Sequence, residues 1–137
     1  MTKWGLTVRG ICEFNNKVLL LKIRPNSSHD AHKWEIPGGK VKKTEFFDDA
    51  LKREYMEETG LKINIRSLYN VIENKYVACK TKEDINSIQL IMKVTSNNDE
   101  VIVSDDHDDY GWFSLDEIKE MIERDMLTKA AVRSFKF

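Results

Sequence analysis

Two apolar-rich segments near the N-terminus, separated by a short polar stretch, predict paired strands. The residues from Leu6 to Phe14 and from Lys17 to Ile23 are rich in aliphatic side chains. Asn15 and Asn16 lie between them, and asparagine tolerates the positive φ angles that tight turns require. The pattern therefore predicts a β-hairpin. Residues 24–33 are mainly polar, which indicates an exposed loop.

Helical periodicity begins after a glycine-containing turn. A short strand, Trp34 to Ile36, is predicted to lead into the turn Pro37-Gly38-Gly39. A helix is then expected from about Glu45 to Thr59, with Thr44 as its N-cap and Gly60 in the left-handed conformation that ends it. One apolar stripe along this helix can pack on a sheet, and its members are Phe47, Ala50, Leu51 and Tyr55.

The second half of the chain returns to alternating patterns. Strands are predicted from Leu61 to Ile72 and from Asn86 to Thr95, with a further short strand at Tyr76 to Cys79. The acidic stretch from Asp105 to Trp112 indicates a loop. Two helix starts follow: Ser114 and Glu117 form a capping box, and Thr128 caps a short last helix ending near Phe135.

This order of elements predicts an α/β fold. Strands come first, then one helix, more strands and terminal helices, which favours a mixed β-sheet with helices packed on both faces. A chain of 137 residues is long enough for one domain with its own core, so residues 1–137 are expected to form a single domain.

Composition bears on the partners, the cellular compartment and the cysteine chemistry expected of the protein. Twenty-two basic and 23 acidic residues nearly cancel, which gives no bulk attraction to nucleic acid or to a membrane surface. The longest aliphatic run, Val18 to Leu21, is far too short to span a bilayer, so a cytoplasmic protein is expected. Cys12 and Cys79 lack metal-binding or redox spacing and are interpreted as reduced, buried or half-buried residues.

The last turns of the central helix carry unusual charge. Glu54, Glu57 and Glu58 stand at positions i, i+3 and i+4, so their carboxylates share one face and repel each other. Arg53 is the nearby cation in that turn. A hard divalent cation such as Mg²⁺, which usually keeps waters and shares substrate phosphates, would relieve the repulsion. The alternative is an ordinary solvated acidic face.

The spacing around these glutamates resembles a known family signature. Gly39 is followed after five residues by Glu45, and after seven more by Arg53-Glu54-Tyr55-Met56-Glu57-Glu58-Thr59-Gly60-Leu61. This sequence resembles the Nudix box, GX5EX7REUXEEXGU, with Tyr55 where the family usually has an aliphatic residue. The resemblance, with the small size typical of the MutT-like branch, implies the Nudix-type α/β/α sandwich.

The resemblance also implies roles for particular residues. Mg²⁺, with Mn²⁺ as an alternative ion, is expected to bind Glu54, Glu57, Glu58 and the carbonyl of Gly38. Glu54 is the first choice for accepting a proton from the attacking water. Arg53 is expected to orient the glutamates, and Glu45 to support them.

A second stretch, from Asp105 to Trp112, is similar to a segment of many Nudix proteins, in which an acidic residue precedes His and a strand ending in Trp and a helix follow. Asp106 is the closest match to a glutamate that often acts there as metal ligand or base, and it is the second choice for the proton acceptor. His107 is expected to be structural or exposed, and Trp112 to belong to the core. His29 and His32 are interpreted as exposed loop residues rather than zinc ligands.

The expected activity is Mg²⁺-dependent hydrolysis of a nucleoside diphosphate linked to another moiety. The MutT-like size favours a nucleoside triphosphate, including oxidised ones, cleaved to the monophosphate and pyrophosphate. The alternatives are ADP-ribose or a nucleotide sugar, a dinucleotide polyphosphate, capped RNA, or a non-catalytic nucleotide sensor. The expected partner is thus a small nucleotide, and a homodimer is an assembly that the resemblance allows.

Overall fold

The computed structural model of the chain describes residues 2–78 and 80–137. The prediction for Cys79 therefore lies outside the described residues, whereas Cys12 is buried and free as predicted. The helices and strands have the following bounds: β1 Lys3–Phe14, β2 Lys17–Ile23, β3 Trp34–Glu35, β4 Gly38–Lys40, α1 Phe47–Thr59, β5 Ile63–Val77, β6 Asp84–Ser96, β7 His107–Phe113, α2 Leu115–Glu123 and α3 Lys129–Ser134.

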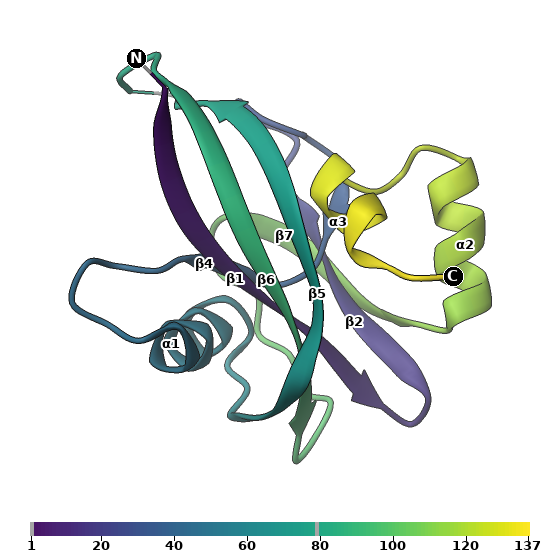
Figure 1. Cartoon of the computed structure of the whole chain (residues 1–137). Coiled ribbons are helices and arrows are strands. Elements are labelled where there is room, and N and C mark those ends of the chain that lie inside the picture. The colour runs from purple at the N-terminus through teal and green to yellow at the C-terminus, as the bar shows by residue number, and fades with distance from the viewer. Residues whose placement is uncertain (1, 79) are drawn as a thin grey trace.

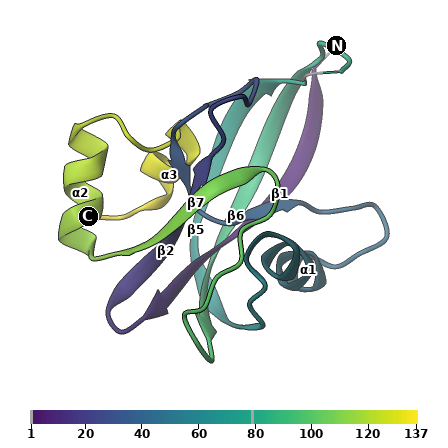
Figure 2. The ribbon, with the colours of Figure 1, turned by 180° about the vertical axis from the view of Figure 1, so that it is seen from behind.

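The predicted mixed sheet with helices on both faces is confirmed. Along the sheet the strand order is β3-β2-β1-β6-β5, with β4 paired to β1 and β7 paired to β2. The pair β1·β6 is parallel and the other pairs are antiparallel. Helix α1 lies on one side of the sheet, and α2 and α3 lie on the other (Figures 1 and 2). No helix in the described part of the chain is long and apolar enough to cross a membrane.

Strand β2 supplies side chains to the cores on both faces. Val18 and Leu20 belong to the apolar cluster under α2 and α3, whereas Leu19 and Leu21 belong to the cluster under α1. All four are at most 2% exposed. A strand buried on both faces reads as a continuous apolar run, because successive side chains point in opposite directions.

Several local predictions are confirmed by the backbone. Asn15 and Asn16 have φ angles of 51° and 61° in the turn between β1 and β2. Gly60 ends α1 in the left-handed conformation with φ of 73°. Ser114 caps α2 through a reciprocal capping box with Glu117, and the hydroxyl of Thr128 accepts a hydrogen bond at the start of α3. Each signal is contained in a few consecutive residues.

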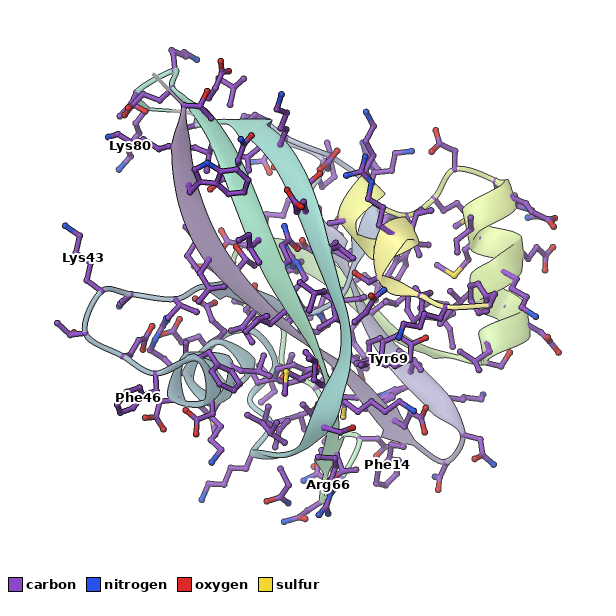
Figure 3. The ribbon with its side chains drawn as sticks, in the orientation of Figure 1. Phe14, Lys43, Phe46, Arg66, Tyr69 and Lys80 are labelled. Atoms are coloured by element: carbon purple, nitrogen blue, oxygen red, sulfur yellow. The ribbon has the colours of Figure 1, made fainter. Side chains whose placement is uncertain are left out.

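The predicted start of α1 is wrong. The helix begins at Phe47 rather than Glu45, and its N-cap is Phe46, whose side chain makes no capping hydrogen bond, rather than Thr44. Glu45 belongs to the preceding turn, where its N–H donates to the carbonyl of Lys42 and its carboxylate accepts from Lys42 N–H. Phe46 is 78% exposed and projects away from the sheet (Figure 3).

Two further predictions are corrected by long-range pairing. Tyr76 and Val77 do not form a separate strand but end β5, whose register with β6 continues to the pair Val77↔Asp84. The predicted acidic loop becomes strand β7 from His107 onward, because this segment pairs with β2. Its Asp108 and Asp109 are exposed, so the strand does not bury those charges. Trp112 is half-buried and packs against the cluster under α1.

The glycine-containing segment lies between two diverging strands. Strands β1 and β2 pair only at Glu13↔Val18 and Phe14↔Lys17 before they separate. Strand β3 then pairs with β2, and β4 pairs with β1, so the segment from Trp34 to Lys40 joins them. The N–H of Gly10 donates to the carbonyl of Pro37 at 3.0 Å. This arrangement brings Gly38 and Gly39 next to α1.

Tyr55 fixes α1 against β1. Its ring is fully buried, and its hydroxyl donates a hydrogen bond to the carbonyl of Gly10. A Cβ added at Gly10 would lie 2.9 Å from the Tyr55 ring, so the ring and the strand backbone are in direct contact. The aromatic residue that departs from the family pattern therefore docks the helix. Burial raises the pKa of its phenol well above the ordinary value.

Replacing Tyr55 by phenylalanine is expected to lower the free energy of unfolding by about 1–2 kcal/mol, because the buried Gly10 carbonyl loses its donor. Urea unfolding followed by circular dichroism measures the change. Tyr110→Phe is the control, since Tyr110 is 39% exposed and its hydroxyl makes no hydrogen bond within the described residues. Equal stability of the two variants would contradict the proposed contact.

Candidate active site

One arginine of α1 contacts two glutamates of the same helix and a third in the turn before it. Arg53 Nη2 lies 2.7 Å from Glu45 Oε1, and its Nη1 lies 3.1 Å from Glu54 Oε1 and 3.3 Å from Glu57 Oε2. The same guanidinium donates to the carbonyl of Lys40 in β4 at 3.3 Å. These charges raise the pKa of Arg53, and its guanidinium lowers the pKa of Glu45 to about 2. Arg53 and Glu45 therefore lie where the sequence predicted an orienting pair.

The glycine pair allows two carboxylates to approach the backbone of β4. A Cβ at Gly39 would lie 2.4 Å from the carboxylate carbon of Glu54. At Gly38, with φ of 154°, a Cβ would lie 2.2 Å from the carbonyl oxygen of Val8. The N–H of Gly38 donates to Glu58 Oε1 at 2.9 Å. Only glycine fits either position without displacing these groups.

The segment before β7 is attached to the end of α1. The N–H groups of Ile102 and Ser104 donate to the carbonyls of Thr59 and Glu58 at 3.0 and 3.3 Å. These bonds satisfy helix carbonyls that have no partner within the helix. They hold the segment so that Asp106 lines the same cleft as Glu58. The two predicted residues, far apart in the sequence, are thus brought to one site.

The cleft is open and lined mainly by charged and polar groups. Its volume is about 850 Å³. The loop between β2 and β3 forms one wall, which includes His29, whereas His32 is exposed outside this lining. Acidic side chains outnumber basic ones in the lining: Asp30, Glu35, Glu58, Asp105 and Asp106 face Arg24 and Lys40.

An ion pair in the wall of the cleft was missed by the sequence interpretation. His107 is 3% exposed, and its Nε2 lies 2.7 Å from Glu35 Oε2. Burial is the largest influence on both groups and opposes their ionisation, but their mutual hydrogen bond and the nearby charges together outweigh it, so the pKa of Glu35 is lowered and that of His107 is raised. Arg9 adds a contact of 3.5 Å to Glu35. His107 lies next to Asp106, so the pair connects the acidic segment to β3.

Two glutamates of α1 have raised pKa values. Burial raises the pKa of Glu54 despite its contact with Arg53. Burial and the neighbouring negative charge of Glu35 raise the pKa of Glu58 to about 7. Glu57, by contrast, is 56% exposed. Burial therefore disfavours the charged forms of two of the three clustered glutamates.

The donor set suits a divalent cation. Carboxylate and carbonyl oxygens are the ligands that Mg²⁺ and Mn²⁺ prefer, and a bound ion would favour the ionised forms of Glu54 and Glu58, which burial disfavours. Within residues 2–78 and 80–137, no three acidic, histidine or cysteine side chains form a ready-made metal cage. Ligation by Glu54 and Glu57 would replace their contacts with Arg53.

Comparison with known proteins identifies the class of enzyme. A family model described as the NUDIX domain matches residues 3–134. Nucleoside triphosphatase NudI from Escherichia fergusonii is 31% identical over 99 residues, which cover 69% of this chain and 70% of the relative. NudI from Salmonella paratyphi B is 30% identical over 105 residues, covering 73% and 74%.

Solved structures show the same fold. The MutT protein from Methanosarcina mazei Go1 superimposes with a TM-score of 0.77 at 27% identity, covering 96% of this chain and 89% of that one. A bifunctional NMN adenylyltransferase/ADP ribose pyrophosphatase from Francisella tularensis, solved with AMP and a Mn ion, gives a TM-score of 0.69 at 20% identity, covering 97% and 40%.

The chain therefore belongs to the Nudix hydrolase family. Its members are pyrophosphohydrolases that act on phosphoric anhydride bonds of small nucleotide substrates and generally depend on a divalent metal.

The raised pKa of Glu58 predicts a pH-dependent stability. Between the ordinary carboxyl value of 4.5 and about 7, the folded protein keeps a proton that the unfolded chain has released. The free energy of unfolding of the metal-free protein is therefore expected to fall across this window, by up to about 3 kcal/mol. His107, with its raised pKa, contributes in the same direction.

Urea unfolding in EDTA at pH 5 to 8 measures this slope. Glu58→Gln is expected to flatten it, whereas Glu123→Gln, an exposed change on α2, is expected to leave it unchanged. A stability that rises steadily from pH 5 to 8 would contradict the assigned environment of Glu58.

The contact between Gly39 and Glu54 predicts a selective defect. Gly39→Ala is expected to displace the Glu54 carboxylate and weaken Mn²⁺ binding by about tenfold or more, as loss of a ligand's correct position does. Because the displaced group is the end of a flexible side chain, the melting temperature should change little. Isothermal titration calorimetry with Mn²⁺ measures the affinity.

Gly5→Ala is the matched control. A Cβ at Gly5 would meet only Ile85 Cγ2, at an ordinary 3.9 Å. Unchanged Mn²⁺ affinity in Gly39→Ala would show that the position of Glu54 has no bearing on the metal.

Proposed function

We propose that this chain hydrolyses nucleoside triphosphates, including oxidised ones, to the monophosphate and pyrophosphate in a Mg²⁺-dependent reaction. The observation that carries the proposal is the set of box glutamates on α1, two of them with raised pKa, of which Glu58 lines an open cleft of about 850 Å³. The proposal goes beyond family membership by choosing the substrate and the ion.

The charge of the cleft supports a cation-dependent reaction. A triphosphate carries several negative charges, and the lining contains more acidic than basic side chains. Without a cation these charges would repel the substrate. Held by Glu54, Glu57, Glu58 and the Gly38 carbonyl, Mg²⁺ would offset phosphate charge, polarise a phosphoryl oxygen and lower the pKa of water. Mn²⁺ has the same ligand preference and is expected to substitute.

Glu54 is assigned as the proton acceptor. Its carboxylate lies against Gly39, which fixes its position within the acidic face of α1. The water oxygen bonds to phosphorus, the anhydride P–O bond between the α- and β-phosphates breaks, and the water proton passes to Glu54. Pyrophosphate leaves with the electron pair of the broken bond.

The other residues position Glu54, offer an alternative proton acceptor or contact phosphate. Arg53 Nη1 contacts both Glu54 and Glu57, while Glu45 binds Nη2 of the same guanidinium. Asp106 is exposed and lines the cleft, so it is the second candidate for the proton acceptor. Lys40, on the strand beside Gly39, and Arg24 are basic side chains of the cleft lining that can contact phosphate.

The choice of a nucleoside triphosphate rests on the relatives. The two NudI proteins are named nucleoside triphosphatases, and each matches more than two thirds of this chain. The Francisella tularensis enzyme, which is named for ADP-ribose, is only 20% identical, so it bears on the fold alone. A triphosphate substrate is therefore favoured over ADP-ribose.

The proposal is tested with a panel of nucleoside triphosphates, ADP-ribose and dinucleotide polyphosphates in Mg²⁺. At least one nucleoside triphosphate is expected to yield its monophosphate and pyrophosphate, identified by anion-exchange chromatography. Glu57→Gln is expected to reduce kcat by about 100-fold or more, because a group that stabilises transition-state charge is lost. Glu123→Gln on α2 is the control and should retain wild-type kcat.

The possible failures have different meanings. Preferential cleavage of ADP-ribose or a dinucleotide would replace the substrate class while leaving the hydrolytic site intact. Mg²⁺-dependent nucleotide binding without product release would instead make the chain a nucleotide sensor and refute the enzyme.

A further inference from the structure

A second hollow, of about 550 Å³, lies beside the reaction cleft. The two share His29, Asp30 and Lys40 in their linings. Gly39, against which Glu54 lies, also lines the second hollow. A volume of this size accommodates part of a small ligand. A nucleotide with its phosphates in the reaction cleft could therefore place its base in the second hollow.

The floor of this hollow is a polar patch on an otherwise apolar sheet face. Ile11 in β1 and Ile91 in β6 belong to the core under α2 and α3. At alternate positions toward the other end of the same face stand Thr7, Arg9 and Gln89, with Thr7 and Gln89 directly paired in the β1·β6 register. Thr7 is 5% exposed and Gln89 3%. Buried polar side chains cost desolvation, so their placement beside a hollow indicates a ligand.

The hydrogen bonds within this patch leave donors without protein partners. Arg9 Nε donates to Gln89 Oε1 at 2.9 Å, and Arg9 Nη1 donates to the carbonyl of Ile36 at 2.8 Å. Because Arg9 can only donate, the Gln89 oxygen must face it, which fixes the orientation of the amide. In the described part of the chain, no acceptor engages Arg9 Nη2 or Gln89 Nε2.

An aromatic ring completes the hollow. Tyr76, near the end of β5, lines it and is half-buried. Lys40 Nζ lies 5.3 Å from the centroid of the Tyr76 ring. Because Lys40 also lines the reaction cleft, the ring lies close to the border between the two hollows. Aromatic faces stack with any base, which gives affinity without selectivity. Selectivity must then come from the donors of Arg9 and Gln89.

We infer that Arg9 and Gln89 read the edge of the nucleobase and select keto bases over amino bases. This inference rests on the proposed function and specifies its substrate. Guanine and hypoxanthine present a carbonyl oxygen at position 6, and uracil and thymine present one at position 4, and each can accept from the two donors. Adenine and cytosine carry an amino group at those positions, which places donor against donor.

Inosine and adenosine triphosphates provide the sharpest test, because their bases differ in the group at position 6. The kcat/KM of the wild-type chain is expected to be at least about tenfold higher for inosine triphosphate, the scale of one base-edge contact. The same direction is expected for uridine over cytidine triphosphate. The ratio cancels any effect on the chemical step, which the two substrates share.

Two variants assign the preference to this pair. Gln89→Glu keeps an acceptor for Arg9 but removes the free amide donor, so the inosine-to-adenosine ratio should fall toward one. Arg9→Leu removes the other donor and should have the same effect. Asn64→Asp, an exposed amide-to-acid change in β5 outside both hollows, is the control and should keep the wild-type ratio.

Binding measurements separate this inference from the proposed function. If no triphosphate is cleaved, calorimetric titration with α,β-methylene analogues of inosine and adenosine triphosphate in Mg²⁺ gives the ratio of Kd values directly. A tenfold preference for the inosine analogue would support the inference even without turnover. Equal affinities in the wild-type chain, no binding of either analogue, or a preference that survives both variants would overturn it.

Discussion

The close approach of two carboxylates to a glycine pair is the constraint on which the site depends. Glu54 lies against Gly39, and Glu58 accepts a hydrogen bond from Gly38, so neither glycine can carry a side chain without displacing its neighbours. The approach is possible because β1 and β2 diverge after two residue pairs and the segment from Trp34 to Lys40 fills the space between them. On the other side, Tyr55 holds α1 against β1. The sheet geometry and the helix docking therefore determine the distance at which the acidic residues meet the backbone.

Electrostatics explains why this arrangement suits polyphosphate chemistry. Arg53 is shared by Glu45, Glu54 and Glu57. The pKa values of Glu54 and Glu58 are nevertheless raised, because burial outweighs the contacts that favour their ionisation. A site with excess negative charge is costly for a protein to maintain without a ligand. A divalent cation and a phosphate group would together neutralise it. The charge pattern and the family membership thus lead to the same class of reaction.

The sequence predicted features whose signal lies within a few consecutive residues. The asparagine turn, the left-handed Gly60, the capping box at Ser114 and the acidic face of α1 are of this kind. Prediction from the sequence failed where contacts between distant segments determine the local structure. Pairing with β2 makes a strand from His107 onward, and the Glu35–His107 pair joins residues 72 positions apart. Glu35 lies within the predicted short strand from Trp34 to Ile36, but no local sequence pattern connects it with His107.

The central claim is that the acidic face of α1 and the glycine pair form a divalent-cation site for nucleotide hydrolysis. The most direct measurement is the anomalous diffraction of crystals grown with Mn²⁺ and a non-hydrolysable nucleoside triphosphate analogue. The account predicts a Mn²⁺ peak within bonding distance of carboxylates from Glu54, Glu57 and Glu58 and of the Gly38 carbonyl, with a phosphate oxygen completing the coordination. Mn²⁺ bound only at other carboxylates, with Arg53 still holding Glu54 and Glu57, would contradict it.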